Sequence, residues 1–153
     1  MSNIQNAEQI IQVAMDFDHA LTSMDIDEIL PFFSEECEIE ILGVTLRGLD
    51  GAKQWLEWLF THLIAIQFEP VIIMVEGNVF FEEFVVVGTL SDGRVVRSKQ
   101  AEVLVYDDYK IKTLRLYFDR LDFVDSIANG FLEKRVVGML IKRSLEGLGE
   151  PSI

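Results

Sequence analysis

Two glutamates on neighbouring predicted strands have the residue type and spacing that acid–base chemistry requires. Glu83 and Glu102 flank residues 90–94, where Asp92-Gly93 is typical of a tight two-residue hairpin turn. If that turn closes the hairpin, Glu83 faces Glu102 and the two carboxyl groups stand side by side on one face of the sheet. Because two neighbouring anions repel, the pKa of at least one is expected to rise. The pair is therefore predicted to supply a general acid and a general base.

A polar line among apolar neighbours is predicted on the same face of the second strand. Ser98, Gln100 and Glu102 alternate along it, and a three-residue turn at 107–109 would place the next strand beside them. Burial among apolar groups would raise the pKa of a carboxyl further. The alternative is that the glutamates face solvent, since a slip of one residue turns every side chain over. The apolar neighbours expected to line the pocket are Leu114, Leu116 and Phe118.

Two predicted helices should cover this face. Residues 6–23 carry an apolar stripe that includes Phe17, while His19 falls on the opposite, solvent-facing side. A second long helix is expected from Asp50 to about residue 67, and its stripe places His62 inward as an auxiliary proton carrier. A satisfied core histidine is the alternative for His62. Four residues of these helices are expected to line the pocket: Phe17, Trp55, Trp58 and Leu59. The two tryptophans and Phe17 are of a type more often found in the core, and in a cone-shaped fold they can serve both roles.

The order of the elements predicts an α+β domain. Short strands are expected at 38–41 and 44–47, an apolar strand at 71–75, and three long strands at 79–89, 95–106 and 110–119. Helices followed by an antiparallel meander are typical of this class. We expect one cone-shaped domain over residues 1–130. Residues 120–129 are also expected to be helical. Residues 131–153 should form a helical extension, with an amphipathic helix at 131–147 that packs on the body or on a partner subunit and buries Val136, Val137, Leu140 and Ile141.

Composition restricts the classes of partner. The 153 residues carry a formal net charge of −13, which disfavours binding to nucleic acid because the phosphates would be repelled. Cys37 is the single cysteine, so an internal disulfide is excluded, and we expect neither a metal site nor a cofactor. No apolar run approaches the roughly 20 residues of a membrane span. We therefore expect a cytoplasmic protein with no membrane partner.

Four segments together resemble one superfamily. The chain is similar to the nuclear transport factor 2-like superfamily, and within it to the SnoaL-like group, whose relatives include polyketide cyclases, ketosteroid isomerase and limonene epoxide hydrolase. The resemblance covers about residues 6–125. It implies a strongly curved antiparallel sheet around a helix-lined conical pocket, often with dimers formed through the outer face of the sheet. The segments are 20–30 (ALTSMDIDEIL), 32–36 (FFSEE), 46–51 (LRGLDG) and 114–119 (LRLYFD).

The resemblance carries over few catalytic residues. Where ketosteroid isomerases have a tyrosine and an aspartate base, this chain has Phe17 and Ile41, and only Glu102 matches their protonated acid. The Arg-x-Asp and final Asp of limonene epoxide hydrolases match Glu83, Val85 and Leu116, so that triad is absent. Glu83 and Glu102 nevertheless fall at positions that the family directs into its pocket.

Three functions stay open at this point. The first is an isomerase, cyclase or hydrolase acting on a small, largely apolar molecule, with Glu102, Glu83 and His62 as its proton carriers. The second is a binding module that holds such a molecule without chemistry, and the third is a structural subunit. A homodimer is also expected, because an apolar cluster on the outer face of the sheet is too large to remain exposed to solvent on a monomer. Its predicted members are Phe84, Val86, Ala101, Val103 and Val105.

Overall fold

The computed structural model describes residues 4–124, 128 and 130–149. It divides into two compact units, residues 1–118 and 119–153, which we describe separately. Within the described residues, no helix is both long enough and apolar enough to cross a membrane.

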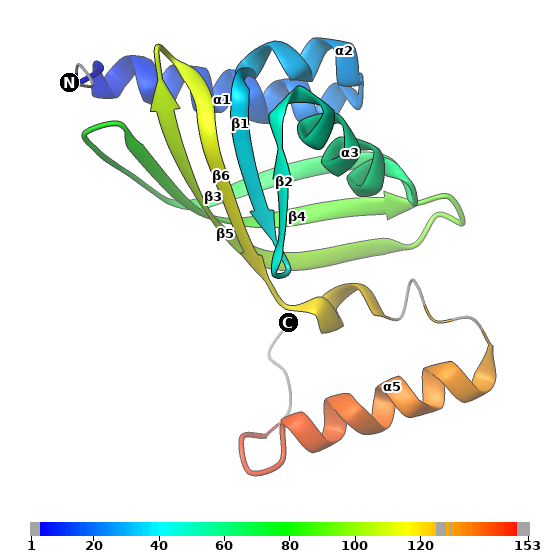
Figure 1. Cartoon of the computed structure of the whole chain (residues 1–153). Helices are drawn as coiled ribbons and strands as arrows, with labels where there is room; N and C mark the ends of the chain where they lie inside the picture. Colours follow the sequence, from blue (N-terminus) through cyan, green and yellow to red (C-terminus); the bar gives the residue numbers. More distant parts are fainter. Residues whose placement is uncertain (1–3, 125–127, 129, 150–153) are drawn as a thin grey trace. The chain divides into compact units, whose positions relative to one another are not determined.

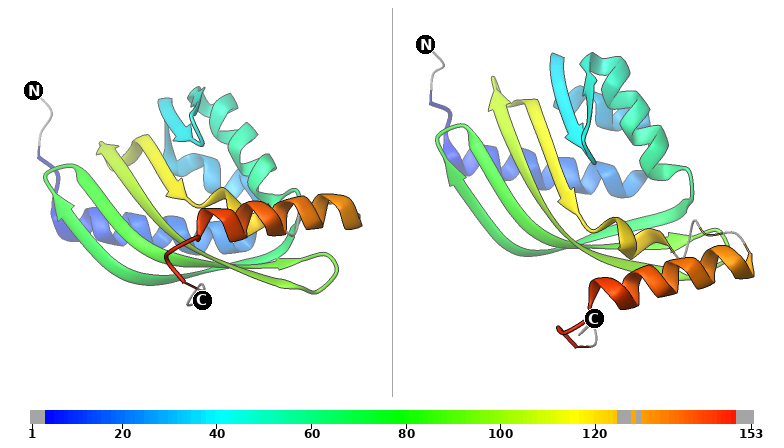
Figure 2. Two further views of the ribbon diagram at one scale, coloured as in Figure 1. Left: turned by 90° about the horizontal axis from the view of Figure 1, so that it is seen from below. Right: turned by 60° about the horizontal axis from the view of Figure 1, so that its bottom comes forward.

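The first unit is a curved six-stranded sheet with helices on its inner face (Figures 1 and 2). The strand order is β2-β1-β6-β5-β4-β3, and every pair is antiparallel except β1 with β6, which is parallel. The predicted α+β cone is confirmed, and the parallel pair makes the sheet mixed. Its elements are α1 (Ala7–Ser23), α2 (Ile26–Ile29), η1 (Leu30–Phe32), β1 (Phe33–Ile41), β2 (Val44–Arg47), α3 (Gly48–Phe60), β3 (Leu63–Glu76), β4 (Val79–Leu90), β5 (Val95–Asp107) and β6 (Lys110–Phe118).

Helix α1 has a defined start, end and buried face. The Gln9 backbone N–H donates to Asn6 Oδ1 over 3.0 Å, which caps the first turn, and Met24 ends the helix in the left-handed conformation (φ 56°). Its apolar stripe is buried as predicted and joins α3 and the inner face of the sheet in one core. The buried members on α1 are Ile10, Ala14, Phe17 and Leu21.

Helix α3 is shorter than predicted, which removes His62 from the interior. The helix ends at Phe60, and β3 begins three residues later at Leu63. The apolar and β-branched residues after Leu63 pair along β4 and are drawn into the sheet, so tertiary pairing outweighs the helical pattern. His62 lies in the connecting turn and is exposed. The prediction that it points inward is wrong.

The β4–β5 hairpin has a different register from the predicted one. Leu90 and Arg94 close a three-residue loop in which Gly93 takes a left-handed conformation (φ 86°), as in a hairpin loop that ends in a bulge. The Arg94 backbone N–H also donates to Asp92 Oδ1 over 3.0 Å. This extra loop residue shifts the pairing by one, so Glu102 stands opposite Glu82 and Ala101 stands opposite Glu83. Glu83 therefore faces the outer side of the sheet.

The β5–β6 hairpin preserves the predicted face and changes the partners. Asp108 and Tyr109, both with positive φ, connect the strands in two residues, and an irregularity follows between Val105 and Tyr106. The register moves by two from the predicted one, and a two-residue shift leaves each side chain on its face. Leu116, and not Leu114, stands beside Glu102.

The register also changes the outer face of the sheet. Phe84 and Val86 were expected outside, but both are buried on the inner side. Ala101, Val103 and Val105 lie outside as predicted, where their β4 partners are Glu83, Phe81 and Val79.

The second unit contains η2 (Arg120–Phe123) and α5 (Phe131–Ser144). The predicted helix over 120–129 falls partly outside the described residues, and its described start is the 3-10 turn that Asp119 caps through Leu121 N–H at 2.8 Å. Helix α5 forms close to its predicted range, yet none of its residues is buried. Val136 and Leu140 are each about half exposed, and their burial against the body or a partner subunit stays a prediction.

Candidate functional site

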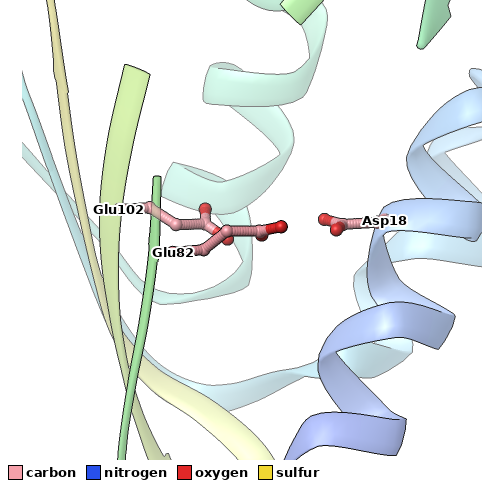
Figure 3. A group of neighbouring side chains, drawn as sticks. All are labelled: Asp18, Glu82 and Glu102. Atoms are coloured by element: carbon pink, nitrogen blue, oxygen red, sulfur yellow. The ribbon is translucent and has the colours of Figure 1, made fainter. Parts of the chain in front are cut away.

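Three carboxyl groups meet between α1 and the inner face of the sheet (Figure 3). Asp18 points from α1 toward Glu82 on β4 and Glu102 on β5. One carboxylate oxygen from each residue lies within 4.8 Å of those from the other two. Glu82 is 1% exposed and Glu102 is 6% exposed, so the cluster sits in the interior. We call Asp18, Glu82 and Glu102 the acidic cluster.

The fold positions each member by a separate device. The cross-strand pairing of β4 with β5 sets Glu82 directly against Glu102. Asp18 follows the buried Phe17 and lies four residues after Ala14 and three before Leu21, so it borders the buried stripe of α1. The cap at Asn6 and the buried stripe fix the helix over the sheet, and the side chain of Asp18 is thereby held facing the two glutamates.

Burial raises the pKa of all three carboxyls, and repulsion from neighbouring carboxyls adds to it at Asp18 and Glu102. Burial is the larger cause for Asp18, whose pKa rises to about 8, with the charge of Glu82 and a hydrogen bond to it as further causes. Burial raises the pKa of Glu82 to about 7, while the hydrogen bond from Asp18 acts in the opposite direction. The pKa of Glu102 is raised well above its ordinary value, by burial first and then by Asp18 and Glu82. The cluster therefore retains protons at neutral pH.

Further polar groups accompany the cluster on β5. Tyr106 is 1% exposed, and its hydroxyl has no hydrogen-bond partner. Burial raises the pKa of this phenol, and the charges of Glu102, Asp18 and Glu82 raise it further, which places the hydroxyl within their field. Glu82 Oε1 is also without a partner. The predicted polar line is present, since Ser98, Gln100 and Glu102 are all buried and Gln100 Nε2 lies 3.3 Å from Ser98 Oγ.

The three residues predicted to carry protons are not brought together. Glu102 reaches the interior, but Glu83 lies on the outer face beside Ala101 and Ile72, and His62 lies in an exposed turn. Asp18 and Glu82 take their places. The signal for Asp18 was its spacing from Ala14 and Leu21, which places it beside the buried stripe. Identification of Glu82 would have required the length of the loop between β4 and β5, because that length sets the register of the hairpin.

The apolar residues predicted to line a pocket separate into three sets. Phe17, Trp55 and Leu114 belong to the closed core, where Phe33 packs edge-on against both Phe17 and Trp55. Trp58 is 52% exposed on the outer side of α3. The third set packs against the core and is only partly buried: Leu59, Leu116 and Phe118.

A groove of about 660 Å³ lies elsewhere on the first unit, and its lining residues include Asp27, Ser34, Leu49 and Lys110. None of its lining residues belongs to the acidic cluster. A second groove, of about 450 Å³, is lined within the second unit by residues that include Leu132 and Val136.

Comparison with known proteins identifies the family of the fold. Residues 14–114 match the model of the SnoaL-like domain. A search of curated protein sequences gave no match.

Solved structures share the fold at low sequence identity. A protein from a Jannaschia species described as a SnoaL-like polyketide cyclase is 13% identical, with a TM-score of 0.71 over 86% of this chain and 98% of that one. The epoxide hydrolase/cyclase-like enzyme SalBIII, which acts in pyran ring formation in salinomycin, is 15% identical with a TM-score of 0.68 over 76% and 95%. A ketosteroid isomerase-like protein from Catenulispora acidiphila, solved with trimethylamine, is 13% identical with a TM-score of 0.67 over 74% and 90%.

Proposed function

Because the chain belongs to the family of SnoaL-like domains, we propose that it is an acid–base catalyst of the isomerase, cyclase or hydrolase kind that acts on a small, largely apolar molecule. The acidic cluster supplies the reacting groups. The relatives that include polyketide cyclases agree with this class, although their low identity limits the likeness to the fold.

One observation carries the proposal: two buried carboxyl groups, Glu82 and Glu102, and the half-buried carboxyl of Asp18 converge from opposite sides of the cone interior. Carboxyls at this spacing cannot all ionise near neutral pH, so the interior holds a proton donor beside a proton acceptor. The pKa values of Asp18 and Glu82, about 8 and about 7, place both groups where they can gain and lose protons at physiological pH. An ordinary exposed carboxyl would be fully ionised there and could only accept.

The roles follow from the same electrostatics. In an isomerisation, the ionised member of the Asp18–Glu82 pair removes a proton from the carbon next to a carbonyl group. Glu102, which retains its proton, donates a hydrogen bond to the carbonyl oxygen as negative charge develops there. The abstracted proton is then returned to another carbon of the same molecule, and both carboxyls regain their starting states. This sequence requires no further reactant.

The partly exposed side chains on β6 provide the approach to the cluster. Leu116 lies beside Glu102 and Phe118 lies beside Gln100 on the inner face. Both are half-buried although they face inward, whereas the groups deeper in the cone are closed. An apolar substrate would contact these side chains and present its polar end to the cluster.

The test uses proton exchange on simple ketones. The protein is incubated in D₂O with a panel of enolisable and β,γ-unsaturated cyclic ketones, and exchange and double-bond migration are followed by ¹H NMR. We expect catalysis above the buffer rate for at least one ketone, and a loss of about a hundredfold in Glu102→Gln. Glu83→Gln removes a neighbouring carboxyl from the opposite face and should keep the wild-type rate. Equal rates in wild type and Glu102→Gln would contradict the proposal.

A further inference from the structure

Among the described residues, the acidic cluster gathers three carboxyl groups and belongs to none of the recorded ion pairs. Each ion pair that the structure records joins exposed side chains, such as Arg97 with Glu69 and Arg47 with Glu38, and none of these pairs includes a member of the acidic cluster. The charges that act on Asp18 and Glu102 come from other carboxyls. A buried anionic site that is not paired with a cation is costly for the fold. In the ligand-free protein the retained protons avoid this cost, and a ligand that brings a cation would allow one of the carboxyls to ionise.

We propose that the acidic cluster binds the protonated amine of a small molecule, so that the ligands of this interior are amphipathic amines with an apolar body. This inference rests on the proposed function, because it names the ligand class of that same site. It goes beyond it by requiring a positive charge that acid–base chemistry on a neutral ketone does not need.

The geometry of the cluster suits an ammonium group. A primary ammonium has three N–H donors in a tetrahedral arrangement, each about 2.8 Å from a carboxylate acceptor, so its three acceptors stand about 4.6 Å apart. One oxygen from each of Asp18, Glu82 and Glu102 lies within 4.8 Å of the other two, which is the reach of a single ammonium group. Asp18 and Glu82 share a hydrogen bond in the ligand-free protein, and the ammonium group would replace it. The oxygens come from a helix on one side and two strands on the other, so a cation between them is contacted from both sides.

One unpartnered polar atom outside the acidic cluster, the hydroxyl of Tyr106, adds a second observation that favours a ligand. The hydroxyl of Tyr106 and Oε1 of Glu82 are buried without a hydrogen-bond partner, and both residues are 1% exposed. A buried polar atom without a partner is rare in folded proteins because its lost hydration is not replaced. An amine that enters the cluster offers N–H donors to Glu82 Oε1. The Tyr106 hydroxyl lies in the field of all three carboxyls and can take part in the same network.

The apolar part of the ligand has a defined direction. Leu116 and Phe118 lie on the inner face beside Glu102 and Gln100 and remain partly exposed. A ligand whose ammonium group sits in the acidic cluster would place its hydrocarbon body along these two side chains. The formal charge of −13 attracts cations to the protein and repels anions, which adds to the selectivity.

A monovalent cation suits this site better than a divalent metal ion. A metal ion bound by three carboxylates requires that most of them ionise, and it usually retains several waters. The cluster instead retains protons at neutral pH because burial raises the pKa of each carboxyl and repulsion raises those of Asp18 and Glu102 further. A single positive charge balances one ionised carboxylate and leaves the remaining carboxyls protonated.

The test compares three ligands of one shape and different charge on the full-length protein. Benzylamine, benzyl alcohol and benzoate are titrated at neutral pH by isothermal calorimetry, with Mg²⁺ and Ca²⁺ as separate titrants. We expect benzylamine to bind saturably and at least tenfold more tightly than benzyl alcohol, and benzoate not to bind. The ¹³C carboxyl signals of Asp18, Glu82 and Glu102 should shift together on addition of benzylamine.

Matched variants locate the binding. Glu82→Gln should lower the affinity for benzylamine at least tenfold and leave the affinity for benzyl alcohol unchanged. Glu83→Gln should leave both affinities unchanged, because Glu83 is one residue along the same strand and lies on the opposite face. Tyr106→Phe should lower the affinity for benzylamine by a smaller factor than Glu82→Gln does, because it removes a neutral hydrogen-bond partner and no charge.

Three outcomes would overturn the inference: benzyl alcohol binding as tightly as benzylamine, benzylamine binding that Glu82→Gln does not weaken, or no saturable binding of benzylamine. Tighter binding of Mg²⁺ or Ca²⁺ than of benzylamine at the cluster would also overturn the inference, because the cluster would then be a metal site. The proposed function fails separately. If benzyl alcohol bound as tightly as benzylamine but ketone exchange depended on Glu102, the inference would fail and the proposed function would remain supported. If the protein bound benzylamine but catalysed no exchange, the proposed function would fail and the protein would be a binding module.

Discussion

Glu82 and Glu102 stand directly opposite each other on β4 and β5, with both carboxyl groups facing α1. This cross-strand pair is the centre of the site, because Asp18 completes it from the helix. Two like charges in this relationship are unfavourable for the fold. A protein that retains them in its interior gives up stability at neutral pH, and that loss can be measured.

The stability of the protein should fall as the pH rises from about 4 to about 8. The carboxyls of Asp18 and Glu82 have ordinary pKa values of 3.8 and 4.5, and folding raises them to about 8 and about 7. Between these limits the folded state binds more protons than the unfolded state, so their contribution is fully present below pH 4 and is lost as pH rises through the folded values. Each group that retains its proton contributes a slope of up to about 1.4 kcal/mol per pH unit.

Urea unfolding at intervals from pH 4.5 to 8.5 measures this slope. General repulsion in a protein of charge −13 also lowers stability as pH rises, so the comparison with Glu82→Gln is decisive. The variant should have a shallower slope than wild type over the same interval. Parallel curves would show that the cluster does not hold the protons.

Removal of one carboxyl from the cluster should stabilise the protein at pH 8. Glu102→Gln retains the shape of the side chain and removes a buried group whose ionisation is opposed by burial and by two neighbouring carboxyls. We expect an increase of roughly 1–3 kcal/mol in the free energy of unfolding at pH 8, and a smaller change at pH 5. Glu83→Gln, on the outer face, should change it by less than about 0.5 kcal/mol. A destabilised Glu102→Gln at pH 8 would contradict this expectation.

Tyr106→Phe should also stabilise the ligand-free protein. The hydroxyl is buried and has no partner, so its removal relieves a desolvation cost of about 1–3 kcal/mol while the ring stays in the core. Thermal unfolding at pH 6 measures the change. Tyr109→Phe is the matched control, because the Tyr109 hydroxyl accepts a hydrogen bond from the Asn6 N–H at 3.1 Å and its loss should be neutral or destabilising. A loss of stability in Tyr106→Phe would show that the hydroxyl is already satisfied.

Much of the fold followed from the sequence. Alternation on the long strands, the stripe of α1 and the resemblance to the SnoaL-like group predicted the cone, and Ser98, Gln100 and Glu102 were assigned to the correct face. These features depend on periodicity, which many residues report together.

The composition of the site depended on single residues. One additional residue in the loop at Gly93 shifts the register, so that Glu82 faces inward in place of Glu83. Because the two glutamates are adjacent, the sequence pattern does not distinguish which of them faces inward. The end of α3 at Phe60 removed His62, because pairing with β4 outweighed a helical pattern. Asp18 lies at the border of an amphipathic stripe, where sequence alone does not separate a surface carboxyl from a buried one.

We propose that the outer face of the sheet joins two copies of the chain. Met74 and Tyr117 are more than half exposed there, and Val103 lies between them among further apolar side chains. An apolar surface of this kind is unusual on a monomer. Sedimentation velocity at micromolar concentration should show a dimer for wild type and a monomer for Val103→Glu. Val44→Glu, at an exposed position of the edge strand β2, is the control that should remain dimeric. A monomeric wild-type protein would refute the proposal.

The hydrogen bond between Asp18 and Glu82 should have a direction. It raises the pKa of Asp18 and lowers that of Glu82, which means that Asp18 carries the shared proton and donates it to Glu82. Asp18→Asn replaces the acid by an amide that can still donate, whereas Asp18→Ala removes the donor. The pKa of Glu82, followed by ¹³C NMR of its carboxyl carbon, should therefore be lower in Asp18→Asn than in Asp18→Ala. Both variants lose the charge of Asp18, so their difference isolates the donor. Equal values in the two variants, or a lower value in Asp18→Ala, would show that Glu82 holds the proton and would exchange the acid and base roles of the two residues.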